Sequence, residues 1–73
     1  MTDPVKWWND HRESAGMDAA SKRGLLALMR QERHAIEDIG ADLSGDWAAE
    51  WHDLNAARMH ELMRAIAEIE AAQ

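Results

Sequence analysis

The sequence predicts an all-α fold, in which an antiparallel hairpin of two long helices follows a short N-terminal helix. Phe and Tyr are absent and valine and threonine occur once each, whereas the strong helix formers Ala, Leu, Met, Glu and Arg are frequent. Long segments of helical periodicity flank the break "LSG" at residues 43–45, which predicts the turn of the hairpin. Because 73 residues suffice for one small domain only, residues 1–73 are expected to form a single helical unit.

The first helix is expected over about residues 4–15. Pro4 suits a first helical turn, and Asp3 or Thr2 precedes it as a candidate N-cap. Gly16 is expected to end this helix, since glycine readily adopts the conformation that follows a helix C-terminus.

The second and third helices are expected over about residues 19–43 and 45–71. Asp18 is a candidate N-cap for the second helix. Ser44 is expected to cap the third, with Asp46 placed favourably in its first turn.

A stripe of mainly apolar residues runs along each long helix. In the second helix it comprises Lys22, Leu25, Met29, Glu32, Ile36, Ile39 and Leu43. In the third it comprises Trp47, Trp51, Leu54, Arg58, Glu61, Ala65 and Glu68, so that Trp47 and Trp51 are expected in the core near the turn.

One charge interrupts the apolar part of each stripe, Glu32 in the second helix and Arg58 in the third. If the chain folds back at Ser44 and Gly45, facing residues have numbers that sum to about 90, and these two charges meet. We therefore predict a Glu32–Arg58 pair that sets the register, because a slip would bury both charges unpaired. The alternative is that Arg58 extends to solvent and Glu32 lies at a loose edge.

The hairpin stripes leave surplus apolar residues, which are Leu26, Leu28, Met59, Met63, Ile66 and, in the first helix, Val5, Trp7 and Trp8. Either the first helix folds over the hairpin, or a second copy packs against it, or both occur. Small domains without disulfides are often stabilised by association, and two hairpins commonly form a four-helix bundle. We therefore expect a homodimer.

Charge is unevenly distributed along this acidic chain, whose formal net charge is −6. Residues 22–33 carry +3 and residues 34–53 carry −6, the latter without a lysine or arginine. The net charge argues against non-specific nucleic-acid binding. Abundant alanine and an excess of arginine over lysine suit a GC-rich bacterial or phage genome.

The residue pattern predicts no enzyme, no metal, no cofactor and no small-molecule substrate. Cysteine is absent, and no two of the four histidines (His11, His34, His52 and His60) are spaced i, i+4 on a helix. Glu32 is the only carboxylate expected in an apolar site, and it has a partner. The sequence lacks an apolar run that could span a membrane and a signal-peptide core, so a cytoplasmic protein is expected.

The favoured function is a small regulator or inhibitor, in the manner of phage-encoded modifiers, that binds a protein partner through helix surfaces. Adjacent residues of a helix point about 100° apart, so Trp7 and Trp8 cannot both face one shallow core. We expect one of them to anchor the partner, and the alternative is that both are buried at a dimer interface. The first helix would then be a recognition element that docks independently of the hairpin. The predicted partner-binding residues are Val5, Trp7 and Trp8, together with Leu26, Arg30 and Arg33 of the second helix.

An alternative function is RNA binding by a dimer of helical hairpins. The expected architecture resembles that of the Rop-type plasmid copy-number proteins, although no Rop sequence motif is present. Phosphate contacts would then come from Lys22, Arg23, Arg30 and Arg33. Acidic mimicry of DNA by residues 37–53 is a weaker possibility, because six acidic residues are few for a duplex mimic.

Overall fold

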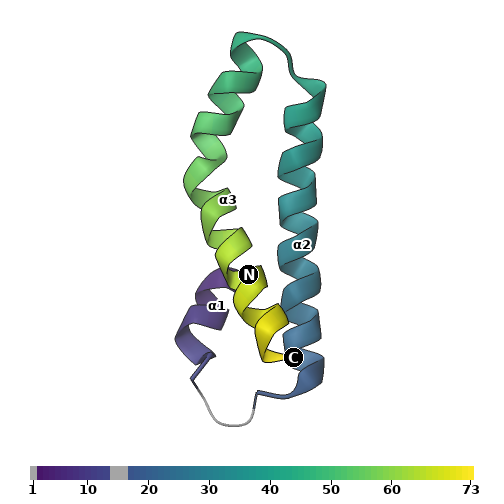
Figure 1. Ribbon diagram of the computed structural model, residues 1–73, viewed down its shortest axis with the longest axis vertical. Coiled ribbons are helices and arrows are strands. Elements are labelled where there is room, and N and C mark those ends of the chain that lie inside the picture. Colours follow the sequence, from purple (N-terminus) through teal and green to yellow (C-terminus); the bar gives the residue numbers. More distant parts are fainter. Residues whose placement is uncertain (1, 14–16) are drawn as a thin grey trace.

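Three helices make up the computed structural model, which describes residues 2–13 and 17–73. They are α1 (Pro4–His11), α2 (Ala19–Asp42) and α3 (Asp46–Ala72). Helices α2 and α3 form an antiparallel hairpin, and α1 lies beside the end of the hairpin that is remote from its turn (Figure 1). The predicted all-α fold, a hairpin preceded by a short helix, is confirmed.

The first two helices begin where the sequence indicates. The Asp3 carboxylate accepts a hydrogen bond from the Val5 N–H at 2.9 Å, and Pro4 occupies the first turn of α1. The Asp18 carboxylate accepts from the Ser21 N–H at 2.7 Å and caps α2 in the same way. These bonds satisfy backbone donors that have no partner within their own helix.

Two predicted boundaries are wrong. Helix α1 ends at His11 rather than near residue 15, because the chain turns there toward the start of α2; the expected role of Gly16 lies outside the described residues. The N-cap of α3 is Gly45, not Ser44, and no side chain caps this helix. Gly45 has a φ of 60°, a conformation that glycine adopts without the steric penalty of other residues, and the chain enters α3 from it.

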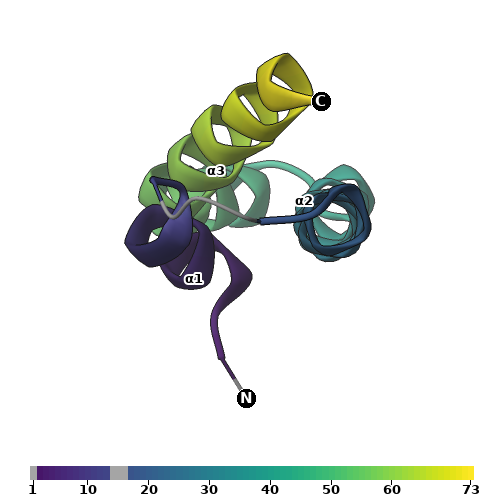
Figure 2. The ribbon, with the colours of Figure 1, turned by 90° about the horizontal axis from the view of Figure 1, so that it is seen from below.

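The core occupies the end of the hairpin that carries α1, here called the base. All three helices contribute buried side chains to it, namely Val5, Trp8, Leu26, Met29, Leu62, Ala65, Ile66 and Ile69. Seen along the hairpin, the three helices lie at the corners of a triangle (Figure 2). Helix α1 therefore folds over its own hairpin, one of the arrangements expected for the surplus apolar residues.

The half of the hairpin near the turn has no such core. The Trp51 indole donates a hydrogen bond to the Ile36 carbonyl oxygen at 3.0 Å and packs closely against Gly40. The indole thereby fills the space between α2 and α3. Trp47, however, is 71% exposed and Leu54 is 76% exposed, so the expected core position of Trp47 is wrong. Two helices cannot enclose these side chains, and no described residue supplies a third helix at this end.

Candidate functional site: an uncovered apolar face on the hairpin

The Arg58 guanidinium joins all three helices at the edge of the core that is nearest to the turn. Its Nε and Nη2 donate to the two carboxylate oxygens of Glu32, with Nη2 to Oε1 at 2.9 Å. Nη1 and Nη2 also donate to the two carboxylate oxygens of Asp3 at 3.0 and 2.9 Å, and Nη1 lies 3.3 Å from Glu61. The structure thus brings the predicted Glu32–Arg58 pair together and adds the N-cap of α1 to it.

Hydrogen bonding explains the titration properties of this cluster. The hydrogen bonds that Arg58 donates to Glu32, and then those that it donates to Asp3, raise the pKa of Arg58 above its ordinary value. The bonds from Arg58 lower the pKa of Asp3, and the backbone N–H of Val5 acts in the same direction. The Arg58 side chain is 25% exposed, so it is partly shielded from water. Because Arg58 binds Asp3, the cluster also marks the level at which α1 begins to cover the hairpin.

The two adjacent tryptophans of α1 have different environments. Trp8 is buried, and its Nε1–H donates to a Glu68 carboxylate oxygen at 2.8 Å. That bond, followed by bonds from Arg64 and Arg12, lowers the pKa of Glu68. Trp7 is half-buried and stacks on His11 with ring centroids 4.1 Å apart. The tryptophan pair therefore supplies one core residue and one residue at the surface.

The predicted partner-binding residues do not form one surface. Val5, Trp8 and Leu26 are buried in the core. Arg30 extends to Glu70 of α3 at 2.8 Å, and Arg33 lies 3.4 Å from Glu37 on its own helix. Helix α1 is held by its core residues and by the Asp3 and Trp8 bonds, so the structure contradicts its expected independence from the hairpin.

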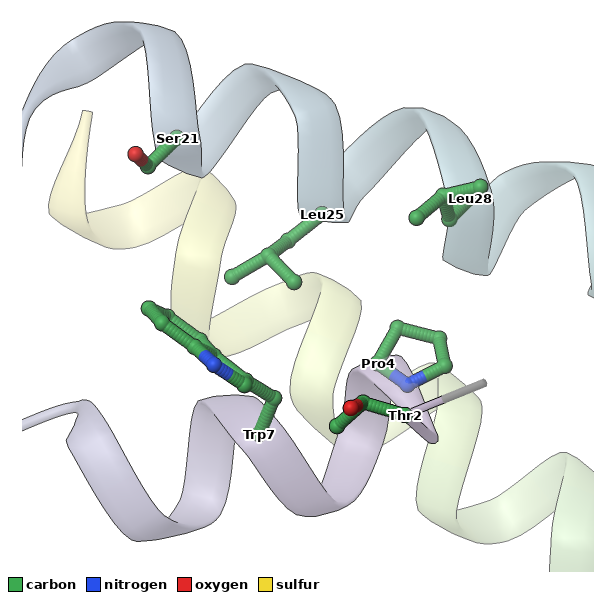
Figure 3. Close-up of a pocket in the computed structure, with 6 residues that line it drawn as sticks. All are labelled: Thr2, Pro4, Trp7, Ser21, Leu25 and Leu28. Carbon is green, nitrogen blue, oxygen red and sulfur yellow. The ribbon is translucent and has the colours of Figure 1, made fainter.

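Trp7 lines a shallow groove of about 300 Å³ between α1 and α2. Pro4, Trp7, Leu25 and Leu28 form its apolar walls, and Thr2 and Ser21 add two hydroxyl groups (Figure 3). Leu28, which is 53% exposed, lies on the rim. The groove is small and open, and none of the described residues that line it is charged.

A larger apolar surface lies near the turn. We call it the turn-end face; it consists of Ile39, Leu43, Trp47, Trp51 and Leu54. The last four of these, with Glu50, line a depression of about 260 Å³. Ile39 is 47% exposed and precedes Leu43 by about one helical turn, which places it on the same side of α2.

The turn-end face continues the side of the hairpin that α1 covers at the base. Leu54 and Arg58 are spaced i, i+4 and so share one side of α3. Arg58 binds Asp3 at the start of α1, whereas Leu54, one turn nearer the hairpin turn, is exposed. One side of the hairpin is thus covered by a helix up to Arg58 and uncovered beyond it.

Carboxylates are concentrated at the turn end of the hairpin. Residues 34–53 contain six of them and no lysine or arginine, and all six are exposed: Glu37, Asp38, Asp42, Asp46, Glu50 and Asp53. Glu37 and Asp38 lie near Arg33 and His34. Within the described ranges 2–13 and 17–73, the other four have no cationic side chain within 4.0 Å.

All residues of this face belong to the two apolar stripes of the sequence, which were expected to face each other in the core. The length of α1 could have corrected this assignment to the core, because a helix that ends at His11 covers only the base. The cations of the RNA alternative are in part already engaged within the chain. Arg30 and Arg33 form the ion pairs given above, and Lys22 donates to the Ala72 carbonyl oxygen at 3.3 Å.

Fold and surface together define a small helical-hairpin protein with a partly uncovered apolar side. Comparisons with protein-family models, curated proteins and solved structures give no match. None of the described helices combines the length and the apolar character that crossing a bilayer requires. Residues 2–13 and 17–73 contain no cluster of three or more His, Cys, Asp or Glu that could hold a metal ion.

Proposed function

We propose that this chain is a small, non-enzymatic regulator or inhibitor, acting in the cytoplasm, that binds another protein through the turn-end face. The observation that carries the proposal is the exposure of Trp47 and Leu54, at 71% and 76%, on the well-formed helix α3. Exposed Trp is unfavourable in a soluble monomer, whereas Trp is enriched among the residues that dominate binding energies.

The packing of Trp51 prepares this face for binding. Its indole is fixed against α2 by the bond to Ile36 and the contact with Gly40, so the segment of α3 that carries Trp47 and Leu54 is attached to α2. A surface that is already ordered loses less conformational entropy when a partner binds. This supports the turn-end face over the α1–α2 groove as the contact surface.

The proposal can be tested by affinity capture from a lysate of the source organism, followed by mass spectrometry. The wild-type chain is compared with Trp47→Ala/Leu54→Ala and with the control Leu28→Ala/Met63→Ala. The control side chains are also exposed, at 53% and 56%, but lie outside the turn-end face. All four changes remove exposed side chains, so the fold should survive them, which circular dichroism would verify.

We expect one protein to be captured by the wild type and by the control but not by the turn-end variant. Capture that is equal for all three chains would overturn the proposal. Capture that disappears on ribonuclease treatment and weakens steeply with salt would instead favour the RNA alternative.

A further inference from the structure

We infer that the ligand of the turn-end face is a cationic amphipathic helix of the partner protein. This inference rests on the proposed function, because it specifies the chemistry of the segment that the face binds. Two observations carry it, the charge around the face and the way in which α1 covers the same side of the hairpin at the base.

Charge selects the class of ligand. The apolar side chains Trp47 and Leu54 adjoin the carboxylates of Asp46 and Asp53 in the chain, and Glu50 lies in the depression itself. An apolar ligand with lysines or arginines at its margins would bury its apolar side and place cations beside these carboxylates. A second copy of this chain would instead bring another six carboxylates to the contact, at a cost in like-charge repulsion.

Helix α1 shows what shape this side of the hairpin accepts. It lies against both α2 and α3 and inserts Val5 and Trp8 between them. Its coverage ends at Asp3, which is held by Arg58. Beyond this level, α2 continues for about ten residues, or about 15 Å of helix, so a ligand helix of about three turns would cover the uncovered length.

The first step of binding would be the approach of the cationic segment to the acidic end of the hairpin. Long-range attraction of this kind accelerates association and is screened by salt. The apolar side of the segment would then cover Trp47 and Leu54, which supply the apolar contact area. The cations of the segment would remain at the margin of the contact, beside Asp46, Glu50 and Asp53. Affinity should therefore depend both on the exposed apolar residues and on the carboxylates.

The test uses the full chain and synthetic peptides of about 18 residues, in which leucines follow a helical period and all other positions are lysine. A second peptide has glutamate in place of every lysine, and a third has the lysine composition in scrambled order. Binding is measured by isothermal titration calorimetry at about 50 mM and about 300 mM salt. Backbone amide shifts in NMR spectra locate the bound peptide on the chain.

We expect the lysine peptide to bind the turn-end face, at least about tenfold more tightly than the scrambled or glutamate peptides, and to weaken as salt is raised. Trp47→Ala should weaken its binding by about thirtyfold, the effect of losing a central Trp contact. Asp46→Asn/Glu50→Gln should weaken it at low salt, whereas the control Asp10→Asn/Glu13→Gln, which removes two exposed carboxylates at the base, should not.

Three results of the peptide measurements would overturn the inference. They are equal binding of the glutamate peptide, lysine-peptide binding that Trp47→Ala leaves unchanged, and amide shifts confined to the base. If the turn-end variant still loses its protein in the affinity capture, the proposed function stands and only the cationic chemistry of the ligand is wrong. A dimer that Trp47→Ala dissociates would identify a second copy as the occupant and would also overturn the inference.

Discussion

Arg58 is the residue on which the arrangement of the three helices most depends. Its guanidinium is shared by Glu32 of α2, Asp3 at the start of α1 and Glu61 of its own helix. An ion pair of this kind contributes little net stability, because both charges lose hydration when they meet. Removal of the cation, however, leaves three carboxylates close together without their shared partner.

Arg58→Met should therefore destabilise the protein by about 1–3 kcal/mol at neutral pH, as judged by urea denaturation. The loss should shrink as the pH falls. Because Arg58 lowers the pKa of Asp3, its contribution is present above the ordinary aspartate pKa and disappears as Asp3 protonates below about pH 4. Glu32→Met/Arg58→Met should recover part of the loss, whereas near-neutral and additive single substitutions would refute the register role of the pair.

Trp7 and Trp8 provide a matched comparison within α1. Trp8 is buried and bonded to Glu68, so Trp8→Ala should cost about 3 kcal/mol or more in unfolding free energy. Trp7→Ala should cost clearly less, because Trp7 is half-buried at the edge of the groove. The same denaturation measurements would decide the point, and equal losses would contradict the assignment of Trp8 alone to the core.

At the scale of the element, the two glycines within α2 differ in their surroundings. A Cβ at Gly24 would meet no atom within 4 Å, whereas a Cβ at Gly40 would lie 3.1 Å from the Trp51 ring. Gly24→Ala should therefore stabilise the protein by about 1 kcal/mol, the difference in helix propensity. Gly40→Ala should gain less or destabilise, since Trp51 must shift, and its hydrogen bond to Ile36 would weaken. Thermal melts of both variants would show the contrast, and equal gains would mean that Trp51 is not held against α2.

Helix positions and the hairpin register could be predicted from local signals. Asp3, Asp18 and Pro4 start their helices through their own side chains or ring, and the Glu32–Arg58 pair followed from two interruptions of apolar stripes. The length of the hairpin that α1 covers could not be predicted in this way, because that length depends on where α1 ends and on how α1 docks. Periodicity identified the apolar stripe from Trp47 to Leu54, but it does not reveal whether a third element encloses that stripe.

Docking of α1 changes the expected result of truncation. If α1 were an independent recognition element, deletion of residues 1–15 would leave a hairpin with a cooperative melt. Because α1 supplies Val5 and Trp8 to the core and Asp3 to the Arg58 cluster, we expect the truncated chain to lose cooperativity and much of its helical signal in circular dichroism. A cooperative melt after truncation would restore the independent role of α1.

At the scale of the whole molecule, charge and apolar exposure meet at the same end. The base has a core, paired charges and both described chain ends (Figure 1), whereas residues 34–53 at the turn end carry six carboxylates and the exposed Trp47. The expected homodimer rested on surplus apolar residues, of which Val5, Trp8, Leu26 and Ile66 are buried in the core, whereas the turn-end face exposes side chains that were expected to be buried in the hairpin. Contact between two such ends would oppose like charges, so its strength should depend on ionic strength.

Salt should therefore separate the two kinds of association. Light scattering after gel filtration at micromolar concentration should give the mass of a single chain, 8.3 kDa, at about 50 mM salt. Any dimer through the turn-end face should increase with salt, because screening weakens the repulsion between two sets of carboxylates. Binding of a cationic helix to the same face should decrease with salt, because screening weakens an attraction. A dimer that is stable at low salt and unaffected by Trp47→Ala would show that the chain associates through another surface, and the α1–α2 groove with Leu28 at its rim would then be the first place to examine.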